Sequence, residues 1–559
     1  MTAASKPFNF IYEAEWNDVP CSDYPLTPER WVAESIRPLE NSQVDTLFYN
    51  LCSSDGYVCD LDSGQILMDN CETLTDAWVW RYRENTKKLI AADANPPKLA
   101  VEHGHRLGLK VIPVVRMNDM HDMFYKDEVS SFKLENPQLL LGYGKYNDWE
   151  RGAQRHPNPE SMESFTWGGF DFAHQEVRDH RFAIIEEFLT RWDNDGVSLD
   201  FDRDPWFFRE AGKEDNAALM TDLVRRVRAV ADDVSKTRGR PQYLHVRVIP
   251  DMDICWQRGM DVKTWVEEGL VDAISPGCGY MTFTQDLEPW LELVRDKPCW
   301  IYPCNNHWKL PEITRAWAKL MFQRGAHGLY LFNWGHLLYG FDKDAKPTSA
   351  SCGTVWYDEL HPCYYEVMRQ IGEAGTMAFE NATYNLESVS HEQLPGEGGA
   401  NRRESRAIDA IELPIELTVG QHSVNIPFAE DLKGANEKGL SPQMTLRLKI
   451  SNYTAPDEFD VSINDQKMDI TTRTSRAVFI MDNDTWFEYP LSDSMIACGD
   501  NELTCDVHKL NPQMSVTPVL MNVELVVIYG AGGEGDEPGY LNVSLRGTFG
   551  SGGLTWDLQ

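Results

Sequence analysis

Two carboxylates near the end of a short apolar run are the residues of this chain best suited to do chemistry. Residues 196–202 alternate apolar with polar side chains, and alternate residues of a strand share a face. Asp200 and Asp202 therefore point the same way, and Pro205 ends the strand. Aromatic residues, beginning with Trp206, follow at once. Carboxylates beside aromatic rings are typical of sugar chemistry, because carboxylates serve as acid, base or nucleophile.

The same segment has a structural interpretation that stays open at this point. A strand end carrying two carboxylates needs solvent, a ligand or a cation to receive them. Arg203 can pair with them at the surface, or Arg247 can bridge Asp200 inside the fold. His245 and Arg247 are in the same way candidates for polar partners in the core.

The surrounding sequence predicts the scaffold that positions these carboxylates. From residue 8 to about 380, short β-rich runs alternate with amphipathic helical stretches. The predicted strands are 8–16, 45–52, 110–118, 196–202, 243–250, 271–275, 299–305 and 328–334. The predicted helices between them are 27–39, 76–107, 176–192, 216–236, 262–268, 287–295 and 311–324, with a last one near 363–379. Eight strand–helix repeats predict an α/β fold, a (β/α)8 TIM barrel with its active site at the C-terminal ends of the strands.

Polar and aromatic residues collect at those strand ends, so we expect a cleft there. The predicted substrate-binding residues are Glu13, Glu15, Asn50, Arg116, Asn118, His121, Arg203, Arg247, Tyr280, Asn305, His307, Asn333 and Trp334. The cationic members could receive an anionic sugar. The alternative is that each arginine neutralises a carboxylate at the strand ends. His121 with Asp119 and Asp122 lacks a recognised metal-ligand pattern, so neither metal nor cofactor is expected.

The predicted catalytic residues are Asp202, Asp200 and Asp251. Two residues apart on one strand, Asp200 and Asp202 have Cα atoms about 6.6 Å apart and cannot attack opposite faces of a sugar. We expect Asp202 to be the general acid, because a neighbouring carboxylate disfavours its ionisation, and Asp200 the nucleophile or orienting charge. The partner across the cleft is predicted to be Asp251. Asp253, Glu13, Glu15 and Asp119 remain alternatives.

The sequence changes character after about residue 384. Short alternating runs between 411 and 528 predict an accessory β-sandwich. The predicted division is a catalytic barrel at 1–384, a linker or loop at 385–400, a β-sandwich at 401–530 and a Gly-rich tail at 531–559.

Charge and hydropathy limit the partners and the location. The 559 residues carry a formal net charge of −35, which disfavours nucleic acid and anionic membranes. No apolar run is long enough to span a membrane, and no signal peptide is seen, although one could have been trimmed. The scattered cysteines favour reduced thiols, so we expect a cytoplasmic protein. Local bridges between Cys52 and Cys59, or Cys498 and Cys505, are the alternative.

Several stretches of the first 380 residues resemble glycoside hydrolase barrels of the family-10-like type. They are residues 172–180, 194–203, 268–272 and 328–334. The fourth strand also resembles the chitinase pattern Asp-Gly-(Ile/Val)-Asp-(Leu/Ile)-Asp-(Trp/Phe)-Glu. Ser198 replaces the first Asp of its triplet and Asp202 replaces its Glu, which argues against chitinase activity. Against the α-amylase pattern, Asp200 would be the nucleophile, but the Arg is missing at Ser198.

The resemblance and the carboxylates together predict an enzyme, a glycoside hydrolase acting on a poly- or oligosaccharide by acid/base catalysis. Its expected partner is a carbohydrate substrate, with anionic sugars among the candidates. Two alternatives stay open, because barrels host many chemistries. One is a barrel that binds carbohydrate without cleaving it, and the other is a lyase acting on an anionic sugar.

Overall fold

A computed structural model describes most of the chain. The described residues are 6–15, 20, 24–123, 125–143, 168–277, 285–306, 311–332, 367–387, 413–477 and 483–529. The predicted linker, apart from its first residues, and the predicted tail lie outside these ranges. Within them, no helix is long and apolar enough to cross a membrane.

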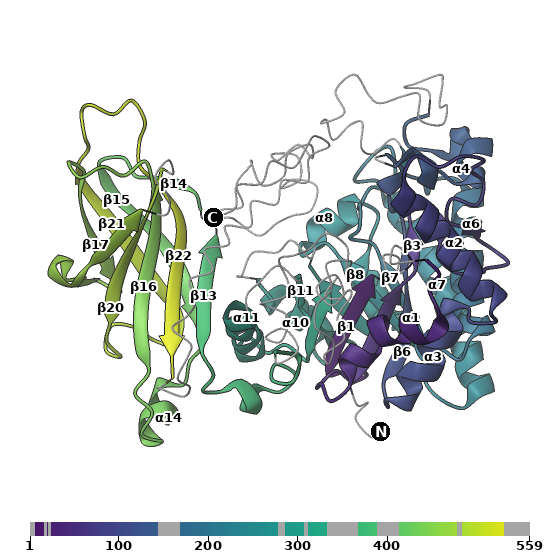
Figure 1. Cartoon of the computed structure of the whole chain (residues 1–559), viewed down its shortest axis with the longest axis horizontal. Coiled ribbons are helices and arrows are strands. Elements are labelled where there is room, and N and C mark those ends of the chain that lie inside the picture. Colours follow the sequence, from purple (N-terminus) through teal and green to yellow (C-terminus); the bar gives the residue numbers. More distant parts are fainter. Residues whose placement is uncertain are drawn as a thin grey trace.

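One parallel sheet forms the N-terminal half of the described chain (Figure 1). Its strands, in chain order, are β1 (Phe10–Glu15), β2 (Thr46–Asn50), β6 (Lys110–Arg116), β7 (Gly196–Asp200), β8 (Tyr243–Val248), β9 (Ala273–Pro276), β10 (Trp300–Ile301), β11 (Cys304–Asn306) and β12 (Leu329–Phe332). Nearly every residue of these strands is buried, as expected when helices cover a parallel sheet. The predicted TIM-barrel architecture is confirmed.

The two edge strands of this sheet, β10 and β11, belong to one chain segment. β10 pairs with β9, and β11 pairs with β12, so the segment closes the ring. Pro303 lies between them and has no N–H to donate, which interrupts the ladder. Its carbonyl still accepts a hydrogen bond from the Tyr330 N–H at 3.0 Å. The predicted seventh strand is therefore present but split.

The covering helices follow the predicted alternation with two exceptions. They are α1 (Pro28–Ser35), α2 (Ala77–Ala91), α3 (Pro96–Arg106), α6 (Gln175–Arg191), α7 (Glu214–Arg238), α9 (Val262–Glu267), α10 (Glu288–Val294) and α11 (Pro311–Gln323). The single helix predicted at 76–107 is wrong, because the chain breaks before Pro96 and restarts with proline at a helix N-terminus. In the described part of the helix predicted near 363–379, residues 367–368 are helical and the next regular element is a 3-10 helix at Ala374–Met377. Three short helices were not predicted: α4 (Ser131–Glu135), α8 (Met252–Gln257) and, in the C-terminal half, α14 (Leu432–Glu437).

The Asp-Gly turn before β7 has a steric reason. Gly196 has a φ of +153°, and a Cβ at this position would collide with the carbonyl of Tyr243 on the neighbouring strand. Only glycine allows β7 and β8 to approach so closely here. The turn thus sets the register in which Asp200 lies beside Arg247.

The C-terminal half is built from antiparallel sheets. One contains β13 (Ala382–Glu387), β14 (Ile415–Glu416), β16 (Gln443–Ser451), β19 (Thr474–Ala477), β20 (Asp484–Leu491) and β22 (Val519–Ile528). The other contains β15 (Gly420–Phe428), β17 (Glu458–Ile463), β18 (Gln466–Lys467) and β21 (Gly499–Lys509). Rings of the two sheets touch, as Phe459 and Phe487 do at 5.6 Å between centroids. The predicted β-sandwich is confirmed.

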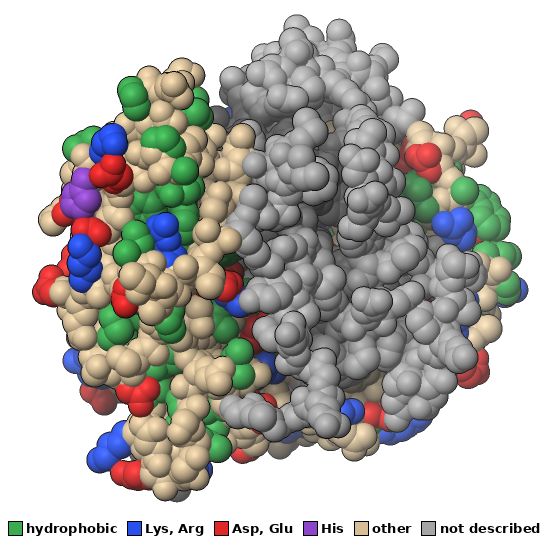
Figure 2. Space-filling view, turned by 60° about the vertical axis from the view of Figure 1, so that its left-hand side comes forward, with side chains coloured by type: hydrophobic (Ala, Val, Ile, Leu, Met, Phe, Trp, Pro, Cys, Tyr) green, Lys and Arg blue, Asp and Glu red, His purple; other side chains and the backbone are tan. Residues whose placement is uncertain are grey.

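Neither the exposed charges nor the cysteines of this half indicate a reactive site. Figure 2 shows acidic and basic side chains interspersed over the exposed face of the sandwich, without a single large patch of one sign. Cys498 and Cys505 are free thiols, as are Cys52 and Cys59 in the barrel, so neither local bridge forms.

Candidate functional site

An aromatic layer inside the barrel forms the floor of the candidate site. The rings of Phe48 and His245 lie 4.8 Å apart, and the Tyr330 ring packs edge-on against both. His245 also contacts the hydroxyl oxygens of Ser198, at 2.7 Å, and Ser275, at 2.9 Å. Burial, reinforced by Arg247, holds the pKa of His245 well below its usual value, so it stays neutral. The alternative that His245 is a core residue agrees with these contacts.

Arg247 joins the two aspartates of the fourth predicted strand. Its Nη2 donates to Asp200 Oδ2 at 2.7 Å, and its Nη1 donates to Asp202 Oδ2 at 2.9 Å. Asp200 Oδ1 accepts the backbone N–H groups of Asp202 and Arg203 at 3.0 Å. Burial opposes the charge of Arg247, but the two carboxylates outweigh it and raise the arginine's pKa. The shared inward face predicted for Asp200 and Asp202 is thus present, together with the Arg247 bridge of the structural interpretation.

Glu13, on β1, is the buried carboxyl group facing this ion-pair cluster. Its side chain has no exposed surface, and Tyr330 donates a hydrogen bond to its Oε2. Its Oε1 has no hydrogen-bond partner among the described residues. Burial raises the pKa of Glu13 to about 8, with Asp200 adding to the rise while Arg247 and Arg116 oppose it. Glu13 therefore carries a proton at neutral pH.

A second buried cation lies beside this group. Arg116, at the end of β6, pairs with Glu15 of β1 and with Asp119, the latter at 2.8 Å. Asp119 also accepts from His121 Nδ1 at 2.6 Å. Burial alone would raise the pKa of Asp119, but His121 and Arg116 hold it well below the usual value. We call the set Glu13, Glu15, Arg116, Asp119, Asp200, Asp202 and Arg247 the mouth cluster.

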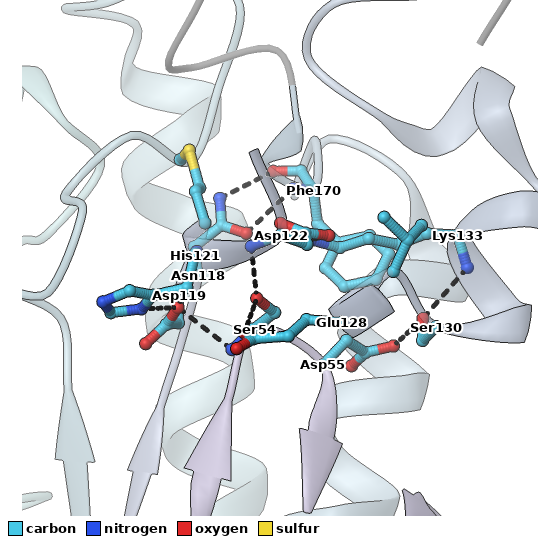
Figure 3. A network of polar contacts seen from close by, with 12 residues as sticks. Ser54, Asp55, Asn118, Asp119, His121, Asp122, Glu128, Ser130, Lys133 and Phe170 are labelled. Atoms are coloured by element: carbon cyan, nitrogen blue, oxygen red, sulfur yellow. Dashed lines mark hydrogen bonds and ion pairs between the residues drawn. The ribbon is translucent and has the colours of Figure 1, made fainter. Parts of the chain in front are cut away.

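The loop after β6 is fixed by a buried polar network (Figure 3). Lys133 donates to Asp122 at 2.7 Å, and Ser53 donates to Glu128 at 2.6 Å. Ser54 bridges both parts, because its backbone N–H binds Asp119 while its hydroxyl accepts from the Asp122 N–H. The network holds the loop that carries Asp119 and His121 against the loop after β2.

Glu128 has an unusual state within that network. Burial raises the pKa of this carboxyl to about 7, against the opposing effects of His121 and the Ser53 hydroxyl. Glu128 accepts hydrogen bonds from two neutral hydroxyls, whereas Asp122 accepts one from the charged Lys133 ammonium. Through the Ser53 and Ser54 hydroxyls, Glu128 ties its own segment to the loop after β2, which is a structural role.

Other predicted site residues have local structural partners. Asn118 donates to the Phe170 and Trp206 carbonyls and accepts from the Phe170 N–H, so it joins two loops. Asp251 is exposed and caps the N-terminus of α8. Asn305 alternates with Cys304, which lies in the inner cluster, so the strand places Asn305 on the opposite face.

The remaining predicted residues divide into two groups. Asn50 Oδ1 accepts the Cys52 N–H at 2.9 Å, while its Nδ2 has no hydrogen-bond partner among the described residues. Arg203 and His121 touch each other at the partly exposed rim. Tyr280, His307, Asn333 and Trp334 lie outside the described residues. The site roles of all these residues stay predictions.

Sequence reasoning missed two side chains at this end of the barrel. Tyr330 contacts Glu13, and its period-two spacing from Phe332 could have indicated that it faces inward. The Arg258 guanidinium lies 3.3 Å from the centroid of the Trp206 ring. These two residues are 52 positions apart, and no spacing pattern in the sequence links them.

The mouth cluster combines a protonated carboxylic acid with carboxylates held against arginines. Acid/base catalysis uses one carboxyl group that donates a proton and a second that acts as base or nucleophile. Among the described residues, no group of three or more His, Cys, Asp or Glu side chains could hold a metal ion.

Comparisons with known proteins give distant structural matches. No family model matches the chain, and no curated protein matches it. A cycloisomaltooligosaccharide glucanotransferase of Paenibacillus sp. is 9% identical, with a TM-score of 0.30, over 92% of this chain and 57% of its own. A multi-modular chitinase of Paenibacillus sp. is 8% identical, with a TM-score of 0.37, over 91% and 52%.

A third solved structure is similar along its whole length. The cyclic α-maltosyl-(1→6)-maltose hydrolase of Arthrobacter globiformis is 9% identical, with a TM-score of 0.35, over 89% of this chain and 99% of its own. The chain thus spans about half the length of the two Paenibacillus enzymes. The matches are a distant structural similarity to glycoside-acting enzymes.

Proposed function

We propose that this protein is a glycoside hydrolase whose reaction is carried by the mouth cluster. The observation that supports this most is the position of Glu13, a fully buried carboxyl on β1, facing Asp200 and Asp202, which pair with Arg247. Glu13 is protonated, with its pKa raised to about 8, while Arg247 holds a positive charge against Asp200 and Asp202. An acid and a carboxylate anion in one water-poor site are the two components of glycosidic bond cleavage.

The contacts favour a different division of roles from the one expected from the sequence. Glu13 is proposed as the general acid in place of Asp202, since its carboxyl holds a proton and Asp202 pairs with a cation. Asp202 becomes the nucleophile or base. Asp200 has both oxygens engaged, by Arg247 and by two backbone N–H groups, and serves as the orienting charge.

The strand order supports contact between these groups and one sugar. β1 and β7 are separated by β2 and β6 in the ring, so their inward residues face each other across the mouth. Glu13 would donate its proton to the glycosidic oxygen as the bond breaks. Asp202 would stabilise the positive charge that develops on the sugar ring, or attack it.

The test is hydrolysis of a panel of neutral and acidic oligosaccharides by the full chain, measured as new reducing ends. Asp202→Asn and Asp200→Asn should each lower turnover per folded molecule by about 10³-fold or more, and each should also lower the melting temperature, because buried Arg247 loses one of its two carboxylates. Asp253→Asn is the matched control, because Asp253 is an exposed aspartate on nearby α8. Its activity should equal that of the unchanged protein.

Two results would contradict the proposal. Cleavage that persists in both Asp200 and Asp202 variants would move the chemistry to other residues. Tight glycan binding with no cleavage of any panel member would leave a carbohydrate-binding barrel without hydrolase activity.

A further inference from the structure

Two buried arginines at the C-terminal end of the barrel strands, Arg116 and Arg247, are already paired with carboxylates. Arg116 lies between Glu15 and Asp119, and Arg247 between Asp200 and Asp202. Both guanidinium groups are almost fully buried. Binding a substrate anion there would require breaking a buried ion pair, which is costly. The two arginines therefore serve the carboxylates of the mouth cluster rather than an anionic substrate.

Arg258 differs from these arginines in its partners. It follows α8 as that helix's C-cap residue and is partly exposed. Within the described ranges the Arg258 side chain forms neither an ion pair nor a hydrogen bond. Its guanidinium carbon lies over the Trp206 ring, 3.3 Å from the ring centroid. Burial lowers the pKa of Arg258 to about 10, which still leaves it fully charged at neutral pH. It is a charged, half-buried guanidinium that lacks a carboxylate.

The surroundings of Arg258 hold it and its aromatic partner in place. The Trp206 carbonyl accepts from Asn118, and the Trp206 N–H donates to the Asp204 carbonyl at 2.7 Å. The Arg258 N–H donates to the Ile254 carbonyl at 3.0 Å. A guanidinium stacked on a ring keeps its edge N–H groups available, and that edge matches the two oxygens of a carboxylate or sulfate. The pair is thus preorganised to bind an oxyanion.

The position of this pair relates it to the mouth cluster. Trp206 lies on the loop after β7, four residues beyond Asp202, and Arg258 lies in the connection after β8. Figure 1 shows α8 beyond the end of β8. The ring of Trp256, one of the larger exposed apolar side chains at 40% exposure, lies on the same short helix. An aromatic face can pack against the apolar face of a sugar ring while a neighbouring guanidinium binds an anionic group that the ring carries.

We propose that Arg258 and Trp206 form a subsite for an acidic sugar, in which the guanidinium edge binds an oxyanion carried by the sugar ring. This rests on the proposed glycoside hydrolase function and adds its substrate class. The oxyanion is a uronic acid carboxylate or a sulfate ester, and both offer the paired oxygens that the guanidinium fits. The three arginines predicted from the sequence to bind an anionic sugar are not needed for this role.

A measurement of equilibrium binding tests this subsite independently of turnover. Calorimetric titrations in an Asp202→Asn background would compare hexagalacturonate, a sulfated carrageenan-type hexasaccharide and neutral cellohexaose. Arg258→Gln should weaken binding of the preferred acidic probe by about tenfold to a hundredfold and leave cellohexaose unchanged. Arg258→Lys keeps the charge but loses the planar fork, so its affinity for the acidic probe should lie between those of the background and Arg258→Gln. Arg295→Gln, which removes an exposed arginine paired with Glu292, is the matched control and should behave like its background.

A footprint on the unchanged protein tests the same contact without a substitution. Phenylglyoxal modifies accessible guanidinium groups, and peptide mapping reports the extent at Arg258. The preferred acidic hexasaccharide should slow modification of Arg258, whereas cellohexaose should not. Protection by the uronate alone identifies a carboxylate, and protection by the sulfated probe alone identifies a sulfate ester.

The results distinguish failure of this inference from failure of the proposed function. If Arg258→Gln binds every probe as the background does, or no acidic probe protects Arg258, the subsite is refuted. Hydrolysis that depends on Asp202 would still support the hydrolase. If Arg258 governs acidic binding while the unchanged protein cleaves nothing, the subsite stands and the hydrolase proposal fails.

Discussion

Two buried glutamates, one in each half of the molecule, have opposite surroundings. Glu430, at the junction of the barrel and the sandwich, has both carboxylate oxygens engaged. Lys319 of α11 donates to each at 2.9 Å, Tyr384 donates to Oε1 at 2.7 Å, and Tyr529 donates to Oε2 at 2.7 Å. Glu13, in the barrel mouth, has Tyr330 on one oxygen, and its other oxygen lacks a hydrogen-bond partner among the described residues.

The difference separates a structural carboxylate from one that is prepared for a reaction. A buried charge is tolerated when donors surround it, as they surround Glu430. A buried carboxyl with too few donors keeps its proton instead, as the raised pKa of Glu13 indicates. Burial alone therefore does not identify a catalytic group, and the unsatisfied oxygen of Glu13 together with its raised pKa makes it the better candidate of the two.

The largest expected effect is on activity. Glu13→Gln should lower kcat by about 10³-fold, because the amide cannot donate the acid proton. In the unchanged protein, kcat/KM should fall above pH about 8, where Glu13 loses its proton. Glu430→Gln, the matched buried glutamate, should keep its activity per folded molecule. Equal losses in the two variants would remove the distinction between these glutamates.

The next largest effect is on stability at the junction. Lys319→Met leaves Glu430 buried without its cation and should lower the free energy of unfolding by roughly 3–5 kcal/mol. Urea denaturation would measure this, with exposed Lys433→Met as the control expected to change nothing. Replacing both Lys319 and Glu430 by methionine should recover much of the loss. An unchanged midpoint for Lys319→Met would mean that the two tyrosines suffice.

The pH dependence of stability provides a smaller test of Glu13. Because its folded pKa is raised from 4.5 to about 8, the folded protein retains a proton that the unfolded chain releases. The contribution of this proton to the free energy of unfolding is fully present below pH about 4.5 and is lost as the pH rises through about 8. Glu13→Gln should abolish this loss and gain at most about 5 kcal/mol relative to the unchanged protein at pH 9. Parallel stability–pH curves would show that Glu13 has an ordinary pKa.

The smallest effect concerns the floor beneath the site. His245→Phe leaves the Ser198 and Ser275 hydroxyls without their shared partner and should cost about 1–3 kcal/mol of stability. Its effect on kcat should be far smaller than that of Glu13→Gln. In the unchanged protein, the His245 ring should stay neutral between pH 6 and 8 by NMR, since its pKa is lowered by burial. Titration in that range would contradict the arrangement described.

Much of the barrel could be predicted because its signals are local. The alternation at 196–202 predicted the inward face of Asp200 and Asp202, and their contacts with Arg247 agree with it. The break before Pro96 was overlooked although proline marks it, because the apolar pattern continues through it. The split at Pro303 was overlooked for the same reason. Short helices such as α8 carry too few residues for a periodic pattern.

Residue spacing along the chain is enough to predict the alternating elements, the sandwich and the end of the barrel where polar residues gather, since each follows from local periodicity and side-chain chemistry. Which charged groups contact each other depends on the folded arrangement. Arg247 lies between two aspartates, Glu13 is left with an unsatisfied oxygen, and Arg258 stacks on Trp206. The state of a carboxyl or guanidinium depends on its desolvation and on charges a few ångströms away. Those neighbours come from strands and loops far apart in the chain, so no local pattern encodes them.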